Sequence, residues 1–208
     1  MEKIYFMKKD DPNFMKAHDF AFKEVFNMLR TDLDRIFMIG TAQDRNQIKG
    51  GLNLSSCAVV LLGIEAMSKF ETIENDDAKS VEKFVDKYFP DNYNGKFKNI
   101  FLSFRHGLLH HFYPKSISAI AKITFLVDEN EYVRDLAYIE KTGVSLLLQK
   151  FEKEKDGTIH VIPQVLYIDF LKAVKKFEEV LFLDHADQHR AVFYENYARI
   201  KKILGHKP

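Results

Sequence analysis

The side chains best suited to chemistry lie in one short segment, Arg105-His106-Gly107-Leu108-Leu109-His110-His111. Histidine is the side chain whose unperturbed charge change lies closest to neutral pH, so it can take up or release a proton there. Arginine is a permanent, planar cation whose guanidinium group matches a phosphate. Packing alone does not require this combination, and the segment is therefore the first candidate for a functional site.

These side chains have the chemistry to cleave RNA without a metal ion. A histidine can accept the proton of a ribose 2′-hydroxyl or donate one to the leaving oxygen. An arginine can hold the phosphate and stabilise the charge that develops in the transition state. The RNA supplies its own nucleophile, so the protein needs only an acid, a base and a cation. We interpret His110 as general acid or base, Arg105 as the phosphate-stabilising cation and His106 as an assisting residue.

Apolar periodicity predicts that four helices precede or contain this segment. Residues 13–39 carry apolar side chains at spacings of three and four, and Asp11-Pro12 supplies a start signal. Residues 54–70 are apolar on nearly all sides, which is typical of a buried helix. Asp76-Asp77 opens a short helix that ends at residue 89. Residues 96–113 form the fourth predicted helix, before Pro114.

Helix geometry constrains how the candidate side chains can meet. His106 and His110 are four residues apart and share a face. Arg105 and His110 are five residues apart, which separates them by about 140° around an ideal helix. They converge on one ligand only if the helix distorts near Gly107 or if a second subunit supplies one of them.

The pattern changes after Pro114. Residues 116–127 are rich in isoleucine and valine with partial alternation, and Asp156-Gly157 is a hairpin signal. We predict a small antiparallel β element at about residues 116–162; a helix over residues 138–150 is an open alternative. Beyond it, a new apolar stripe begins near Pro163 and predicts further helices.

Together these patterns predict a mainly α protein in which residues 1–208 form a single domain. The helical core covers about residues 13–114, the β-containing segment about residues 116–162, and the C-terminal helices about residues 163–204. Asp184-His185-Ala186-Asp187 is a candidate cap for the last helix.

The segment Arg105-His106-Gly107-Leu108-Leu109-His110 resembles the motif of the HEPN superfamily, an arginine separated from a histidine by four to six residues. A polar residue commonly follows the arginine of that motif, and His106 fits. The resemblance covers roughly residues 13–114 and includes the all-round apolar helix. It implies a HEPN-like helical bundle, often a homodimer. Several family members are ribonuclease toxins whose two motif copies meet across the dimer interface, whereas others are binding or assembly modules.

Two hypotheses of different classes follow from the segment and the resemblance. In the first, the chain is a metal-independent endoribonuclease or RNA-binding protein that uses Arg105, His110 and His106. In the second, it is a non-catalytic helical interaction module whose residues 100–113 are structural. A homodimer is the expected assembly in both, and RNA is the partner in the first.

Composition excludes several other classes. The 208-residue chain has 31 basic and 30 acidic residues, a formal charge of +1, so it lacks the strongly basic balance of a protein coated by nucleic acid. No apolar run approaches the roughly 20 residues that span a bilayer, and the N-terminus is not of the signal-peptide type. We expect a cytoplasmic protein without a membrane partner. Its single cysteine, Cys57, is interpreted as a buried small hydrophobe.

The sequence gives little support for a metal or a cofactor. His106 and His110 have the spacing of two helical zinc ligands, but Gly107 stands where a metalloprotease motif has glutamate. His185 and His189 lie near two aspartates and form a second possible cluster, which is also typical of a solvated helix start. We see no glycine-rich phosphate loop, paired-cysteine site or nucleophile elbow. We therefore predict neither a resident metal nor a cofactor.

Overall fold

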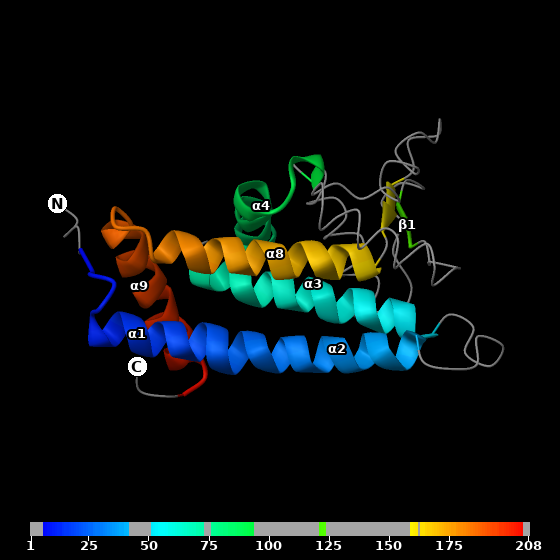
Figure 1. The fold of residues 1–208 in the computed structure, drawn as a ribbon, viewed down its shortest axis with the longest axis horizontal. Coiled ribbons are helices and arrows are strands. Elements are labelled where there is room, and N and C mark those ends of the chain that lie inside the picture. Colours follow the sequence, from blue (N-terminus) through cyan, green and yellow to red (C-terminus); the bar gives the residue numbers. More distant parts are fainter. Residues whose placement is uncertain are drawn as a thin grey trace. The chain divides into compact units, whose positions relative to one another are not determined.

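The structure is a computed structural model that describes residues 6–41, 51–72, 76–93, 121–123, 159–161 and 163–205. For residues 37–41, 51–55, 92, 121–123, 159–161 and 163–164 it describes the backbone alone. The helices are α1 (Pro12–His18), the π-helix η1 (Asp19–Phe26), α2 (Asn27–Thr41), α3 (Gly51–Glu71), α4 (Asp77–Tyr88), the 3-10 helix η2 (Asp91–Tyr93), α8 (Pro163–Leu181) and α9 (Asp187–Ile203) (Figure 1). The prediction of a mainly α protein is confirmed for the described residues.

Backbone contacts divide the chain into two compact units. Unit 1 comprises Met1–Asp32, Gly63–Gly95 and Phe170–Pro208, and unit 2 comprises Leu33–Leu62 and Lys96–Asp169. Helices α2, α3 and α8 each contribute residues to both units. Most described side chains belong to unit 1. The single domain over residues 1–208 stays a prediction.

Helices α1, η1 and α2 follow one another without a break and carry a stripe of rings four residues apart, at Phe14, His18, Phe22 and Phe26. In a plain α-helix the twelve-residue separation of the first and last rings would turn them about 120° apart. The i to i+5 hydrogen bonds of η1 widen its turns, so each residue rotates the chain less. Both ends of the stripe therefore reach the α8 side: Phe14 meets Phe182 and Phe26 meets Phe170, with ring centroids 5.6 and 5.9 Å apart.

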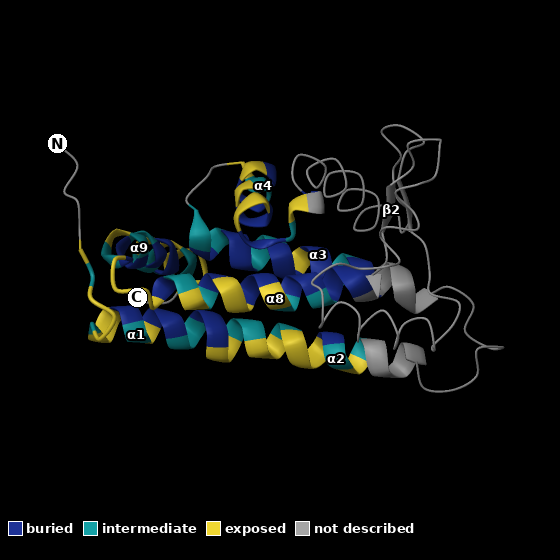
Figure 2. Cartoon of the chain, turned by 45° about the horizontal axis from the view of Figure 1, so that its top comes forward, coloured by how far each residue is buried: buried dark blue, intermediate teal, exposed yellow. Residues whose placement is uncertain are grey.

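The core of unit 1 is built around Phe177 of α8 and Phe193 of α9. Both are fully buried, and their ring centroids lie 6.0 Å apart. One or both of them contact the rings of Phe14, Phe22, Phe70, Phe84, Tyr88 and His189. Ring pairs at such separations contribute about 0.5–1.5 kcal/mol each beyond their buried area. One aromatic cluster thus joins α1, η1, α3, α4, α8 and α9. Figure 2 shows buried residues along these helices.

Helix α3 is buried on most sides, as its all-round apolar composition predicts. Cys57 is fully buried, which confirms its interpretation as a small hydrophobe, and burial raises the pKa of its thiol to about 12. Gly63 allows a close approach, because a Cβ there would lie 3.1 Å from Cε1 of Phe170. Among the described helices, none combines the length and apolar character needed to cross a membrane.

Two short strands lie inside the predicted β element of residues 116–162. β1 (Ala121–Ile123) pairs with β2 (Ile159–Val161) in parallel, with Ala121 opposite Ile159. The predicted antiparallel sense is therefore wrong for this pair. The hairpin signal at Asp156-Gly157 directly precedes β2, whereas the connection from β1 is long enough for the crossover that parallel strands require. The rest of the predicted element lies outside the described residues.

Candidate functional site

The predicted site residues Arg105, His106 and His110 lie outside the described residues. So does the whole helix predicted for residues 96–113, and so does the helical alternative at residues 138–150. The geometry of the predicted RNA-directed site is therefore untested, and the site stays a prediction. The described residues contain other groups of titratable side chains that are wholly or partly buried.

One largely buried carboxylate, Glu71 at the end of α3, accepts hydrogen bonds from three donors on two other helices. Its Oε2 accepts hydrogen bonds from Nε2 of His189 at 2.6 Å and from the Tyr88 hydroxyl at 3.0 Å. Its Oε1 accepts one from Nζ of Lys87 at 2.6 Å. The Glu71 side chain is only 9% exposed, and a charge so buried needs partners of this kind. We call Glu71, Lys87, Tyr88 and His189 the Glu71 cluster.

Helix boundaries bring the Glu71 cluster together. Helix α4 begins after Asp76, whose side chain accepts from the backbone N–H of Ala78 at 2.9 Å. This confirms the predicted start of α4 and places Lys87 and Tyr88 in its last turn. His189 lies in the first turn of α9, and Glu71 is the last residue of α3. The cluster therefore links the C-terminal ends of α3 and α4 to the N-terminal end of α9.

Opposing effects set the ionisation of the cluster. Burial alone raises the pKa of Glu71, but the hydrogen bonds and charges of His189 and Lys87 outweigh burial and hold this pKa below its ordinary value. Burial raises the pKa of Tyr88, and the adjacent Glu71 carboxylate raises it further. At neutral pH Glu71 is therefore ionised and Tyr88 protonated, which are the forms that their hydrogen bond requires.

We expect the cluster to stabilise the fold between two pH limits. The pKa of Glu71 is depressed by folding, so its contribution is present above the ordinary pKa of 4.5 and is lost as the pH falls through the folded value. The pKa of Tyr88 is raised by folding, so its contribution is present below 10.0 and is lost as the pH rises through the folded value. Urea unfolding across this range, followed by circular dichroism, measures both losses.

A Glu71→Gln variant is the control for the acid limit. Because glutamine does not titrate, the difference in unfolding free energy between wild type and variant should shrink as the pH falls below 4.5. An equal difference at about pH 3 and about pH 7 would show that Glu71 titrates alike in the folded and unfolded chain.

An open depression of about 440 Å³ adjoins the cluster and is lined by Glu71, Thr72, Lys83, Asp86 and Lys87. Its two lysines and two carboxylates carry no net charge. A carboxylate that orients an imidazole is a common acid–base arrangement, yet His189 is not among the residues that line the depression. In the described part of the chain, the cluster therefore has the geometry of a structural ion network.

Another histidine, the buried His18, lies in the aromatic stripe at the end of α1. Its Nε2 is 2.8 Å from Oε1 of Glu178, and its Nδ1 is 3.4 Å from Oδ1 of Asp19. Its ring stacks on Phe22, with centroids 4.8 Å apart, and forms a T-shaped pair with Phe182. His18 therefore ties the first helix to α8 and has the contacts of a core residue.

The predicted cluster around His185 and His189 is divided in the structure. Asp184 pairs with Lys9 at 2.9 Å, Asp187 pairs with Arg190, and His189 turns to Glu71. Across the described residues, no group of three or more His, Cys, Asp or Glu side chains is placed to hold a metal ion. The predicted cap is also absent, since α9 begins after Ala186 without a side-chain cap.

The sequence pattern missed the largely buried Glu71 and the buried Arg190. Glu71 directly follows the apolar run of residues 54–70, and an acid at that position is a signal that could have been used. Arg190 has no distinguishing signal, because a basic residue near the start of a helix is ordinarily solvated.

Comparisons of the chain with family models, with curated proteins and with solved structures found no match.

Proposed function

We propose that this chain is a HEPN-like helical-bundle protein that cleaves RNA without a metal ion, or binds it, through Arg105 and His110. The observation that carries the proposal is the spacing of Arg105 and His110 on the helix predicted for residues 96–113. The buried apolar helix α3 before this segment and the mainly helical fold are consistent with the resemblance. The proposal includes a cytoplasmic location.

In the proposed reaction, the ribose 2′-oxygen attacks phosphorus and the bond from phosphorus to the 5′-oxygen breaks. His110 takes the 2′-hydroxyl proton or donates a proton to the leaving oxygen, with His106 assisting. Arg105 stabilises the extra negative charge on the phosphoryl oxygens. Because Arg105 and His110 lie about 140° apart on an ideal helix, the proposal includes a homodimer in which two copies of the motif complete each other.

The test is cleavage of labelled RNA by the purified chain in the presence of a chelator. We expect cleavage by the wild type and a loss of about 100-fold or more for Arg105→Ala and for His110→Ala. His185→Ala, which changes an exposed histidine, should leave the rate unchanged. A substrate with a 2′-deoxy nucleotide at the scissile position should resist cleavage.

Other outcomes decide between the parts of the proposal. RNA binding without cleavage, weakened by added salt and by Arg105→Ala, leaves the RNA-binding form alone. Absence of both cleavage and binding, or equal cleavage by all variants, contradicts the RNA-directed function. Light scattering should give twice the 24.3 kDa chain mass, and a monomer at micromolar concentration contradicts the homodimer.

The second candidate function is a non-catalytic helical interaction module. It is consistent with the structural role of the charged side chains Glu71 and Arg190, whose hydrogen bonds lie within unit 1. This hypothesis expects self-association or partner binding without RNA cleavage, and the Arg105 and His110 variants should then behave as the wild type.

A further inference from the structure

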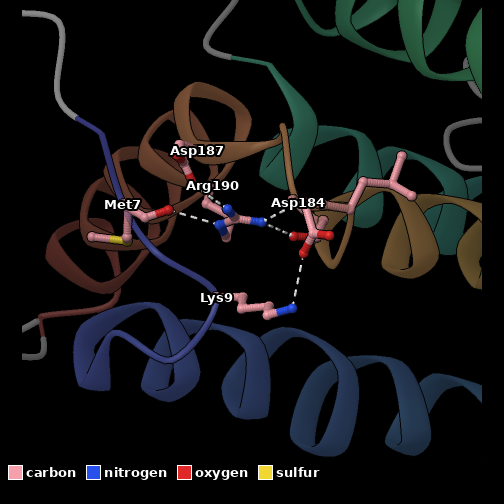
Figure 3. Close-up of polar contacts among 7 residues, drawn as sticks. Met7, Lys9, Asp184, Asp187 and Arg190 are labelled. Atoms are coloured by element: carbon pink, nitrogen blue, oxygen red, sulfur yellow. Dashed lines mark hydrogen bonds and ion pairs between the residues drawn. The ribbon is translucent and has the colours of Figure 1, made fainter.

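The guanidinium group of Arg190 is the centre of a buried contact network near the start of α9. Arg190 is 1% exposed. Its Nη1 donates to the carbonyls of Leu181 and Leu183 at 2.7 and 2.9 Å, and its Nη2 bonds Asp187. Its Nε donates to the carbonyl of Met7 at 2.7 Å (Figure 3). One side chain thus holds the end of α8 and a segment near the N-terminus together.

That segment, residues 6–9, contacts the α8–α9 connection through Lys9 and Asp184 and the start of α9 through Met7, and we call it the N-terminal strap. Both backbone groups of Met7 are used, because its N–H also donates to the carbonyl of Asp187 at 3.2 Å. The side chain of Phe6 is 73% exposed, so it contributes little to docking. Lys9 pairs with Asp184 (Figure 3), but their side chains are 57% and 91% exposed, and such surface pairs contribute little.

We propose that the N-terminal strap and the α8–α9 turn, residues 182–186, form one latch that opens and closes as a unit. The two parts share the Arg190 guanidinium, and removal of the strap leaves Nε of a buried cation without its acceptor. Docking uses the main chain of Met7, so it does not depend on the side chain at that position. A partner or protease that binds the strap and displaces it therefore also destabilises the C-terminal end of α8. This inference is independent of the proposed action on RNA.

The test compares Met7→Pro with Met7→Ala in the full chain by hydrogen–deuterium exchange. Proline has no backbone N–H, so Met7→Pro breaks the bond to Asp187, whereas Met7→Ala keeps both backbone groups. The readout in the turn is the exchange of the amides of Phe182, Leu183 and Ala186, which all donate within or next to the turn. We expect Met7→Pro to speed their exchange by about tenfold and to speed tryptic cleavage after Lys8 and Lys9.

Met7→Ala should match the wild type in both measurements, and the amides of α4 should be unchanged in both variants. Faster exchange in the strap with unchanged exchange in the turn would overturn the coupling. Equal behaviour of the alanine and proline variants would overturn docking through the main chain.

Discussion

Replacement of Phe177 by alanine is expected to lower the free energy of unfolding by about 3–5 kcal/mol. Phe177 is fully buried, and its ring contacts rings from η1, α4 and α9. Truncation removes apolar area from the core and leaves a cavity lined by η1, α4, α9 and α8 itself. No single side chain can fill such a cavity. Urea unfolding followed by far-UV circular dichroism measures the loss, since the chain has no tryptophan.

Two further variants test whether the loss comes from the core position. Phe177→Leu keeps most of the volume and should cost clearly less than Phe177→Ala. Ile203→Ala changes an apolar side chain that is 84% exposed, and its effect should stay within about 0.5 kcal/mol. A loss below about 1 kcal/mol for Phe177→Ala would contradict the central place of Phe177 in unit 1.

Replacement of Glu71 by alanine is the second change with a large expected effect, a loss of about 3 kcal/mol of unfolding free energy. The substitution leaves His189 and Tyr88, which are buried or nearly so, without their common acceptor. The loss of the Lys87 contact costs less free energy, because the Lys87 side chain is 47% exposed and water can replace the lost partner. The same unfolding measurement at neutral pH gives the magnitude.

Asp86→Ala is the matched control, because Asp86 is an exposed acid that lines the same depression. Its effect should stay within about 0.5 kcal/mol. Lys87→Met should cost less than Glu71→Ala, since the methionine keeps the packing and two donors still satisfy Glu71. If Asp86→Ala and Glu71→Ala have equal effects, the loss reflects net charge and not the cluster.

Much of the helical framework was predictable because periodicity and start signals agree at α1, α4 and α8. Asp11 caps α1 and Asp76 caps α4, both as predicted, and α8 begins at Pro163. The π-helical form of η1 was not predictable, because an apolar spacing of four residues fits an α-helix equally well. The prediction of antiparallel strands was wrong because a turn signal such as Asp156-Gly157 indicates only a local bend. The relative direction of paired strands depends on long-range contacts.

Buried polar contacts were less predictable than the helices that carry them. The sequence pattern predicts a cluster of His189 with His185 and the nearby aspartates. In the structure its partner is instead Glu71, which is distant in sequence. Arg190 looks like a surface cation, and its burial depends on the backbone carbonyls of Met7 and Leu181, which no sequence pattern displays. The candidate site at Arg105 and His110 follows from residue chemistry and resemblance alone.

The π-helix η1 also determines how the chain responds to a change in length. Eleven residues of plain α-helix rotate by about 20° beyond whole turns, whereas twelve rotate by about 120°. Phe14 and Phe26 are twelve residues apart, and η1 absorbs the surplus residue. Deletion of one residue within Asp19–Phe26 would therefore convert η1 to α-helix and keep both flanking faces aligned with the core. The same deletion in the middle of α8 would turn half of that helix by about 100° and move its apolar face out of register.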